Sequence, residues 1–172
     1  MADATMNDEH VNGTPFPTRG RLADDTRATL VKGLNVSLAS TFDLHSQVKQ
    51  AHWNLKGAQF VARHELFDDL ADHLRGWTDD LAERATTLGG YAEGTTRRAA
   101  ERSVIPEYDL RAVDGRQHLQ ALAERYGAYC GHIRELVDAT QQLGDPATED
   151  LYTEILRDAE MDLWFLEAHL QS

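Results

Sequence analysis

The chain of 172 residues is long enough for one domain with a substantial core, and 17 Lys and Arg against 29 Asp and Glu give it a formal net charge of −12. Such a balance repels polyphosphates and disfavours non-specific nucleic-acid binding through a basic surface. The single cysteine, Cys130, excludes a disulfide within the chain. No window approaches the roughly 18 consecutive apolar residues of a membrane span, and the polar N-terminus lacks an apolar signal core. We therefore expect a soluble cytoplasmic protein without a membrane partner.

The prolines indicate how the chain is divided. They stand at only three places and leave two proline-free stretches, 18–105 and 107–145, as long helices require. Residues 1–22 mix Gly, Pro, Asn and Thr without hydrophobic periodicity. The sequence therefore predicts a flexible N-terminal tail over 1–22 and a single domain over 23–172.

Hydrophobic periodicity predicts the helices of the first half of the domain. Apolar side chains recur at three- and four-residue steps from about 24 to 56, and glycine follows this stretch. A second helix is expected from about 60 to 88, where a glycine pair ends it. The stretch 91–113 is mostly connection, with one short helix around Thr95–Arg102.

Capping residues mark where the last two long helices begin. Asp114 and Gln117 have the spacing of a capping box, so a third long helix starts at Asp114. Asp145 followed by Pro146 is typical of an N-cap with proline at the first helical position. No run alternates with period two for long enough to predict a strand. The sequence predicts an all-α fold, a four-helix bundle with a short helix in the central connection.

The second predicted helix carries an acidic stripe about 100° from its apolar face. Its members are His64, Asp68, Asp72, Asp79 and Glu83. Like charges four residues apart repel by roughly a few tenths of a kcal/mol per pair, and only Arg75 offsets them. One interpretation is an ordinary solvated face. The other is a site for a first-row divalent ion such as iron, manganese or zinc, because carboxylate and imidazole suit these ions and the lack of thiolates argues against a closed structural zinc site.

The spacing within this stripe limits how one ion is bound. Asp68 and Asp79 are 11 residues apart, so they point the same way but lie roughly 16 Å apart along the helix. Two copies of the helix, crossing antiparallel near residues 73–74, would place Asp68 and its neighbouring histidine beside Asp79 and Glu83 of the partner. Symmetry then demands two equivalent sites per dimer. No glutamate has a histidine three residues later, which disfavours an intrasubunit di-iron centre of the Glu-x-x-His type.

At residues 51–90 the chain resembles the signature of the Dps family, the mini-ferritins named for DNA protection in starved cells. The motif is carried by His52, Trp53, Asn54, His64, Asp68, Asp79 and Glu83. Helix order and length are similar over about 22–170. The resemblance implies a hollow dodecameric shell of ferritin-like four-helix subunits with ferroxidase sites at two-fold interfaces. Iron is the metal it implies, and no organic cofactor is implied.

The resemblance also assigns roles to the ligands. His52, His64 and Asp68 would come from one subunit, and Asp79 and Glu83 from its partner. Asp79 and Glu83 would be the main carboxylate ligands and His52 a direct imidazole ligand, with His64 and Asp68 completing a second, weaker position or hydrogen-bonding it.

The implied reaction is the oxidation of Fe²⁺ to Fe³⁺, preferably by hydrogen peroxide, followed by deposition of ferric mineral inside the shell. Trp53 would lie beside the site and intercept radicals; an ordinary core tryptophan is the alternative. Candidate residues for mineral nucleation, with plain solvation as the alternative, are Glu65, Asp69 and Asp72. Candidate residues for an acidic entry pore are Asp145, Asp150 and Glu154; a helix cap is the alternative for the first of them.

The termini bear on whether DNA is bound directly. Some family members use a lysine-rich tail, but residues 1–22 contain no lysine. The basic cluster of Arg97, Arg98 and Arg102 is interrupted by Glu101 and favours salt bridges or a solvated connection. Since phosphate neutralisation needs several cations, direct DNA binding is disfavoured. A DNA-coating protein with secondary iron chemistry remains the alternative function, and a plain helical interaction module is the third.

The remaining histidines and the cysteine fall outside the motif. We expect them to be hydrogen-bonded within the bundle, and Cys130 to be an inert core thiol. These histidines are His45, His73, His118, His132 and His169.

Overall fold

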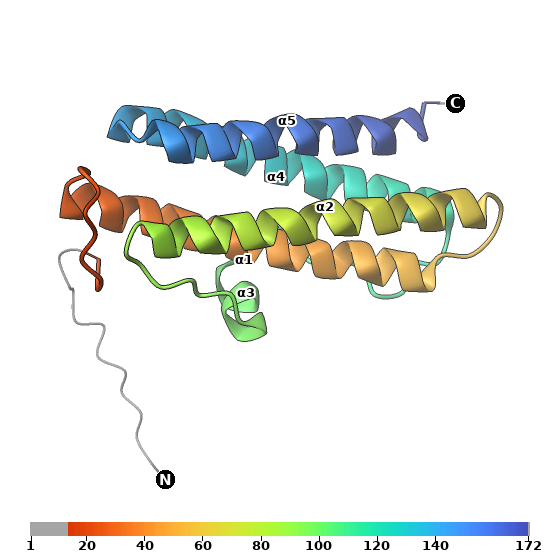
Figure 1. Ribbon diagram of the computed structural model, residues 1–172. Helices are drawn as coiled ribbons and strands as arrows, with labels where there is room; N and C mark the ends of the chain where they lie inside the picture. The colour runs from red at the N-terminus through yellow and green to blue at the C-terminus, as the bar shows by residue number, and fades with distance from the viewer. Residues whose placement is uncertain (1–13, 172) are drawn as a thin grey trace, which may run out of the picture.

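The computed structural model describes residues 14–171, and this part of the chain contains five helices and no strand (Figure 1). The helices are α1 (Asp24–Asn54), α2 (Phe60–Thr87), α3 (Thr96–Arg102), α4 (Gly115–Leu143) and α5 (Pro146–Ala168). The predicted all-α bundle with a short central helix is confirmed, and the helix bounds lie within two residues of those expected from the periodicity. Among the described helices, none combines the length and the hydropathy that a bilayer-spanning helix needs.

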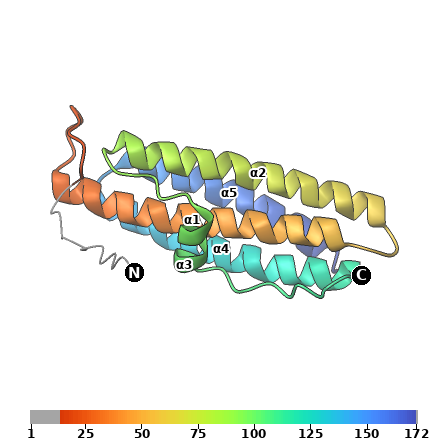
Figure 2. The ribbon, with the colours of Figure 1, turned by 90° about the horizontal axis from the view of Figure 1, so that it is seen from below.

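Two helical hairpins make the bundle. α1 packs chiefly on α2, and α4 packs chiefly on α5. The connection between the hairpins runs back along the bundle, so that α4 begins at the same end as α2 (Figure 1). On its way it places α3 against the side of α1 (Figure 2). The face formed by α1, α2 and this connection is therefore built from three segments of the chain.

The core consists of the apolar faces that the periodicity predicts. Burial of these side chains supplies the main favourable free energy of folding. Fully buried side chains on the four long helices include Leu34, Leu44, Phe67, Leu70, Leu81, Leu119, Leu122, Ile133, Tyr152 and Ile155. This core fixes the rotation of each helix and thereby which side chains face outward on α2.

The capping predictions had different outcomes at the two sites. Asp114 accepts hydrogen bonds from the backbone nitrogens of Arg116 and Gln117, at 2.9 and 3.2 Å, and caps α4. Asp145 occupies the N-cap position of α5, but its side chain makes no capping hydrogen bond to the backbone. Its carboxylate instead accepts a 2.7 Å hydrogen bond from Arg84, because a charge-assisted bond is stronger than a bond to a backbone N–H.

The segment before α1 packs on the end of the bundle. The backbone nitrogen of Phe16 donates to the carbonyl of Gly89, at 3.1 Å. The buried Arg27 guanidinium donates to the Phe16 carbonyl, at 3.4 Å. These contacts involve residues 14–22 of the predicted tail, and the sequence did not indicate them because a backbone hydrogen bond to a distant turn leaves no periodic signal. Residues 1–13 of the predicted tail lie outside the described part.

Candidate metal centre

A tight turn between α1 and α2 brings two predicted ligands together. The chain reverses over residues 55–59, where Gly57 and Gln59 take positive φ angles of 99° and 60°. The last turn of α1 therefore lies beside the first turns of α2. The rings of His52 and His64 stack there, with centroids 3.6 Å apart and planes inclined by 22°.

Hydrogen bonds to the backbone fix the tautomer of both rings. Nδ1 of His52 lies 3.1 Å from the carbonyl oxygen of His64, and Nδ1 of His64 lies 3.2 Å from the carbonyl oxygen of His52. A carbonyl only accepts, so each Nδ1 carries the hydrogen and each Nε2 keeps a lone pair for a metal. Burial lowers the pKa of His52, which favours the neutral imidazole that a metal requires.

A carboxylate completes this half-site. Asp68 follows one turn after His64, and its Oδ1 lies 3.4 Å from Nδ1 of His52. One ligand atom from each of His52, His64 and Asp68 falls within 4.8 Å of the other two, and residues 14–171 contain no other group of three such side chains this close. The structure thus brings together the three ligands that the resemblance assigned to one subunit.

Lys49 lies beside this half-site, a contact that the sequence did not indicate. Its Nζ donates to Asp68 Oδ1 at 2.6 Å. This hydrogen bond holds the pKa of the Asp68 carboxyl below its usual value. Lys49 and His52 are three residues apart on α1, but the approach to Asp68 depends on the packing of α1 on α2. The carboxylate is therefore held by a cation in the position where a metal would bind it.

The other two predicted ligands lie apart from this cluster. Asp79 and Glu83 are exposed on α2, about three and four turns beyond Asp68. Asp79 lines a shallow hollow on the face of α1 and α2 together with Phe42 and Gly76. One subunit therefore presents the cluster of His52, His64 and Asp68 and, apart from it, a separate pair of exposed carboxylates.

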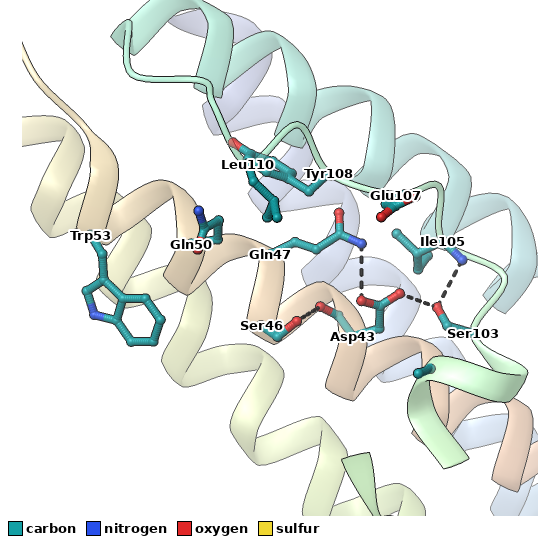
Figure 3. A pocket seen from close by; sticks show the side chains of 11 residues that line it. Asp43, Ser46, Gln47, Gln50, Trp53, Ser103, Ile105, Glu107, Tyr108 and Leu110 are labelled. Atoms are coloured by element: carbon teal, nitrogen blue, oxygen red, sulfur yellow. Dashed lines mark hydrogen bonds between the residues drawn. The ribbon is translucent and has the colours of Figure 1, made fainter. Parts of the chain in front are cut away.

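Trp53 is not a core residue of the subunit, since 69% of its surface is exposed. It lies at one end of a pocket between α1 and the connection to α4, apart from the hydrogen bonds of Asp43 with Gln47 and Ser103 (Figure 3). The Lys49 ammonium stands over its indole ring, 5.9 Å from the centroid. This places the indole next to the half-site and open to solvent.

The candidate nucleation and pore residues differ in their surroundings. Exposed among them are Glu65, Asp69, Asp72, Asp150 and Glu154. Asp145 is only 4% exposed and is bonded to Arg84 and Thr148. Burial raises the pKa of Asp145, but these hydrogen bonds and the Arg84 charge outweigh it and hold the value below its usual range.

Four of the five histidines outside the motif find hydrogen-bond partners inside the subunit. His118 bonds to the Tyr108 hydroxyl at 2.7 Å, and His132 lies 3.3 Å from the Ser37 hydroxyl. His73 bonds to Asp162, His169 bonds to the Phe165 carbonyl, and His45 is half-buried.

The thiol and two of the three arginines of the basic cluster are likewise held within the subunit. Burial raises the pKa of Cys130 to about 12, as an inert thiol requires. In the basic cluster, Arg98 pairs with Glu93 and Glu101, and Arg102 pairs with Glu93.

Comparison with known proteins agrees with this geometry. A family model described as a ferritin-like domain matches residues 31–172. The DNA protection during starvation protein of Agrobacterium fabrum is 42% identical over 154 residues, covering 90% of this chain and 95% of that protein.

Two solved structures share the fold over nearly their whole length. DpsC from Streptomyces coelicolor superposes with a TM-score of 0.87 at 34% identity, covering 94% of this chain and 93% of that one. A Dps protein from Vibrio cholerae O1, described as a member of a broad superfamily of ferritin-like diiron-carboxylate proteins, gives 0.85 at 26% identity, covering 93% and 99%. The bundle, the ligand cluster and these relatives together show that the chain belongs to the Dps family of ferritin-like proteins.

Proposed function

We propose that this protein oxidises Fe²⁺ to Fe³⁺ with hydrogen peroxide at centres shared by two subunits, and stores ferric mineral in a hollow dodecameric shell. The observation that carries the proposal is the cluster of His52, His64 and Asp68, in which one ligand atom of each residue lies within 4.8 Å of the other two and both imidazoles keep the Nε2 lone pair. Nitrogen and oxygen ligands of this kind suit iron, and carboxylates favour the ferric product. The diiron-carboxylate description of the Vibrio cholerae relative supports iron as the substrate.

In this proposal the partner subunit completes each centre. Two α2 helices cross antiparallel near residues 73–74, so that Asp79 and Glu83 of one subunit reach the histidines of the other. The hollow around Gly76 supports a close approach, because a Cβ at Gly76 would meet no atom within 4 Å. A two-fold axis then produces two equivalent centres per dimer.

The chemistry balances for a pair of irons. Each Fe²⁺ loses one electron, and one hydrogen peroxide takes both electrons as its O–O bond breaks and two protons are added to give two waters. The reaction removes both reagents that form hydroxyl radical, which is how DNA would be protected. The exposed Trp53 indole lies where it can be oxidised by a radical that escapes the centre.

The exposed carboxylates supply the other steps of storage. Glu65, Asp69 and Asp72 are the proposed nucleation residues of the mineral. Asp150 and Glu154 are the proposed pore carboxylates that attract Fe²⁺. Asp145 belongs to the same proposed pore, but in the subunit its charge is already neutralised by Arg84.

Iron oxidation after anaerobic loading tests the function. Fe²⁺ is bound without oxygen, a stoichiometric amount of peroxide is added, absorbance follows ferric formation, and a dye assay counts the remaining peroxide. We expect fast oxidation at two irons per peroxide in the wild type and slow oxidation in Asp79→Ala/Glu83→Ala. Asp80→Ala, an exposed carboxylate beside Asp79, is the matched control and should behave as the wild type. Equal rates in wild type and double variant would contradict the proposal.

The assembly has its own measurement. Twelve chains of 19.3 kDa would sediment as a particle of about 230 kDa. A particle of two chains would contradict the dodecameric shell. The centre shared by two subunits could still be tested in that sample.

A DNA-coating role is the second candidate, favoured by the name of the Agrobacterium fabrum relative. The pairing of Arg98 and Arg102 with glutamates weighs against direct phosphate contact by the described part of the chain. Gel retardation at low salt that disappears at moderate salt would support coating, since phosphate contacts are released by salt. Absence of retardation at low salt would exclude it.

A further inference from the structure

Trp53 shares a pocket of about 560 Å³ with Tyr108, a residue that no motif in the sequence singled out (Figure 3). Trp53 comes from the last turn of α1, and Tyr108 comes from the connection that leads to α4. The indole is 69% exposed, whereas Tyr108 is only 6% exposed. A radical in solvent therefore meets the indole before it meets the phenol.

The Tyr108 hydroxyl is bonded to a base. It lies 2.7 Å from Nδ1 of His118, whose side chain is fully buried. A phenol is a stronger acid than the N–H of a neutral imidazole, so the hydroxyl donates and Nδ1 accepts. Burial lowers the pKa of His118 and raises the pKa of Tyr108. At rest the imidazole is therefore neutral and the phenol keeps its proton.

Two other buried tyrosines have partners of a different kind. The Tyr129 hydroxyl bonds to the Thr41 hydroxyl at 2.8 Å, and the Tyr152 hydroxyl lies 3.2 Å from the Ser37 hydroxyl. A neutral hydroxyl is thus enough to satisfy a buried phenol in this protein. An aliphatic hydroxyl is too weak a base to take up a proton, whereas the imidazole beside Tyr108 can take one.

Oxidation of a phenol requires such a base. A tyrosine that loses an electron becomes a very strong acid, so its oxidation is easier when the hydroxyl proton leaves with the electron. The guanidinium carbon of Arg125 lies over the Tyr108 ring, 5.0 Å from its centroid. This positive charge disfavours a charged phenol radical and favours release of the proton to Nδ1 of His118.

We propose that Tyr108 and His118 form a redox-active pair that reduces the Trp53 indole after a radical has oxidised it. The inference rests on the proposed role of Trp53 beside the iron centre. Electrons tunnel between aromatic side chains that do not touch, so transfer across the shared pocket needs no contact between the two rings. The oxidising equivalent thereby moves from the surface of the subunit to a buried phenol.

The steps balance for hydroxyl radical as the oxidant. The radical takes one electron from the Trp53 indole and one proton from solvent, and leaves as water. Tyr108 returns an electron to the indole, and its phenolic proton moves to Nδ1 of His118. A neutral tyrosyl radical and an imidazolium remain. Fe²⁺ resets the pair when it gives one electron to the tyrosyl radical and His118 returns the proton.

Pulse radiolysis with azide radicals tests the pair in the full-length protein without metal. An azide radical takes one electron from an exposed indole and becomes azide, and absorbance then follows conversion of the tryptophanyl radical into a tyrosyl radical. We expect a first-order conversion whose rate is independent of protein concentration. Tyr108→Phe should lose most of the tyrosyl product, and Trp53→Phe should lose it as well.

The chain offers matched controls for these variants. Trp164→Phe removes another exposed indole, Tyr91→Phe removes an exposed phenol, and Tyr129→Phe removes a buried phenol that is bonded to a hydroxyl. All three should keep the conversion. In D₂O the wild-type conversion should slow about twofold, because a proton moves with the electron. A merely structural hydrogen bond between Tyr108 and His118 would produce no such effect.

The inference is overturned if Tyr108→Phe forms as much tyrosyl radical as the wild type, or if the rate in D₂O is unchanged. His118→Gln should slow the conversion; if this variant fails to fold, Tyr108→Phe and the rate in D₂O still decide the result. Because no iron is present, the outcome is separate from that of the iron-oxidation assay. A failed iron assay with an intact conversion would contradict the proposed function alone.

Discussion

His52 and His64 each donate a ring hydrogen bond to the backbone of the other, from Nδ1 to a carbonyl oxygen at 3.1 and 3.2 Å. The two bonds join the end of α1 to the start of α2 on both sides of the turn. Because both Nδ1 atoms carry the donated hydrogens, both Nε2 atoms keep a lone pair. The two hydrogen bonds that hold α1 and α2 together at the turn therefore also leave two ring nitrogens able to bind a metal.

Replacing one member of this pair should affect both stability and chemistry. His52→Ala removes a ligand and the ring hydrogen bond to the His64 carbonyl, so we expect iron oxidation to fall at least tenfold and the free energy of unfolding to fall by about 1 kcal/mol. Stopped-flow absorbance and urea unfolding at matched protein concentration measure the two effects. His45→Ala, half-buried on the same helix, is the control for truncating a histidine. Oxidation at the wild-type rate would remove His52 from the centre.

Lys49 should compete with the metal for Asp68. Because an exposed ion pair is worth about 0.2–1 kcal/mol, Lys49→Gln should tighten metal binding at the half-site by up to about fivefold. The difference should shrink as ionic strength rises, because salt screens the pair. Calorimetric titration with Co²⁺ on the protein carrying Asp79→Ala/Glu83→Ala isolates this half-site, and Lys32→Gln is the control. Weaker binding in Lys49→Gln would mean instead that the lysine holds Asp68 in its ligating position.

The pair between α2 and the start of α5 should contribute strongly to stability. Arg84→Met leaves the buried Asp145 carboxylate without its cation, and we expect a loss of about 3 kcal/mol at pH 7. The pKa of Asp145 in the folded protein lies below its ordinary 3.8, so its contribution is present above that value and is lost as the pH falls through the folded pKa. The difference between Arg84→Met and wild type should therefore shrink in acid.

Thermal unfolding from pH 7 to pH 3 measures this dependence. Arg111→Met, an exposed arginine, provides the baseline for removing a guanidinium. A difference that stays constant across the pH range would show that Arg84 acts through packing of its side chain rather than through its charge.

Cys130 should be unreactive in the folded protein. Its pKa is raised to about 12 by burial, so little thiolate is present at pH 8 and access is restricted. We expect disulfide-exchange reagents to label it at least about 100-fold more slowly than the same thiol in guanidinium-unfolded protein. Rapid labelling of the native protein would indicate that α4 opens locally around this residue.

The fold could be predicted from the sequence because each long helix carries an uninterrupted apolar face. Spacing alone also grouped His64 with Asp68 and separated both from Asp79. The motif added His52, whose approach to His64 depends on where the chain turns. These features are local, so they are visible in the order of the residues.

Contacts between segments distant in the sequence could not be predicted in the same way. Lys49 reaches Asp68 only because α1 packs on α2, and no sequence interval indicates it. The Asp145 carboxylate bonds to the Thr148 side chain and to the guanidinium of Arg84, which lies 61 residues earlier in the chain and is indicated by no local pattern. Which charged side chains pair therefore depends on how the helices pack, and not on the spacing of residues along the chain.

Because of its bond to Asp68, the reactivity of the Lys49 amine depends on whether an ion is bound at Asp68. The whole chain has only three lysines, and the Lys49 side chain is 22% exposed while it is paired. An ion that takes Asp68 releases this ammonium, so acylation at Lys49, read by peptide mass, becomes a footprint of occupied centres. The ratio of label at Lys49 to label at Lys56 would then give the fraction of half-sites that hold an ion, even for an ion without visible absorption.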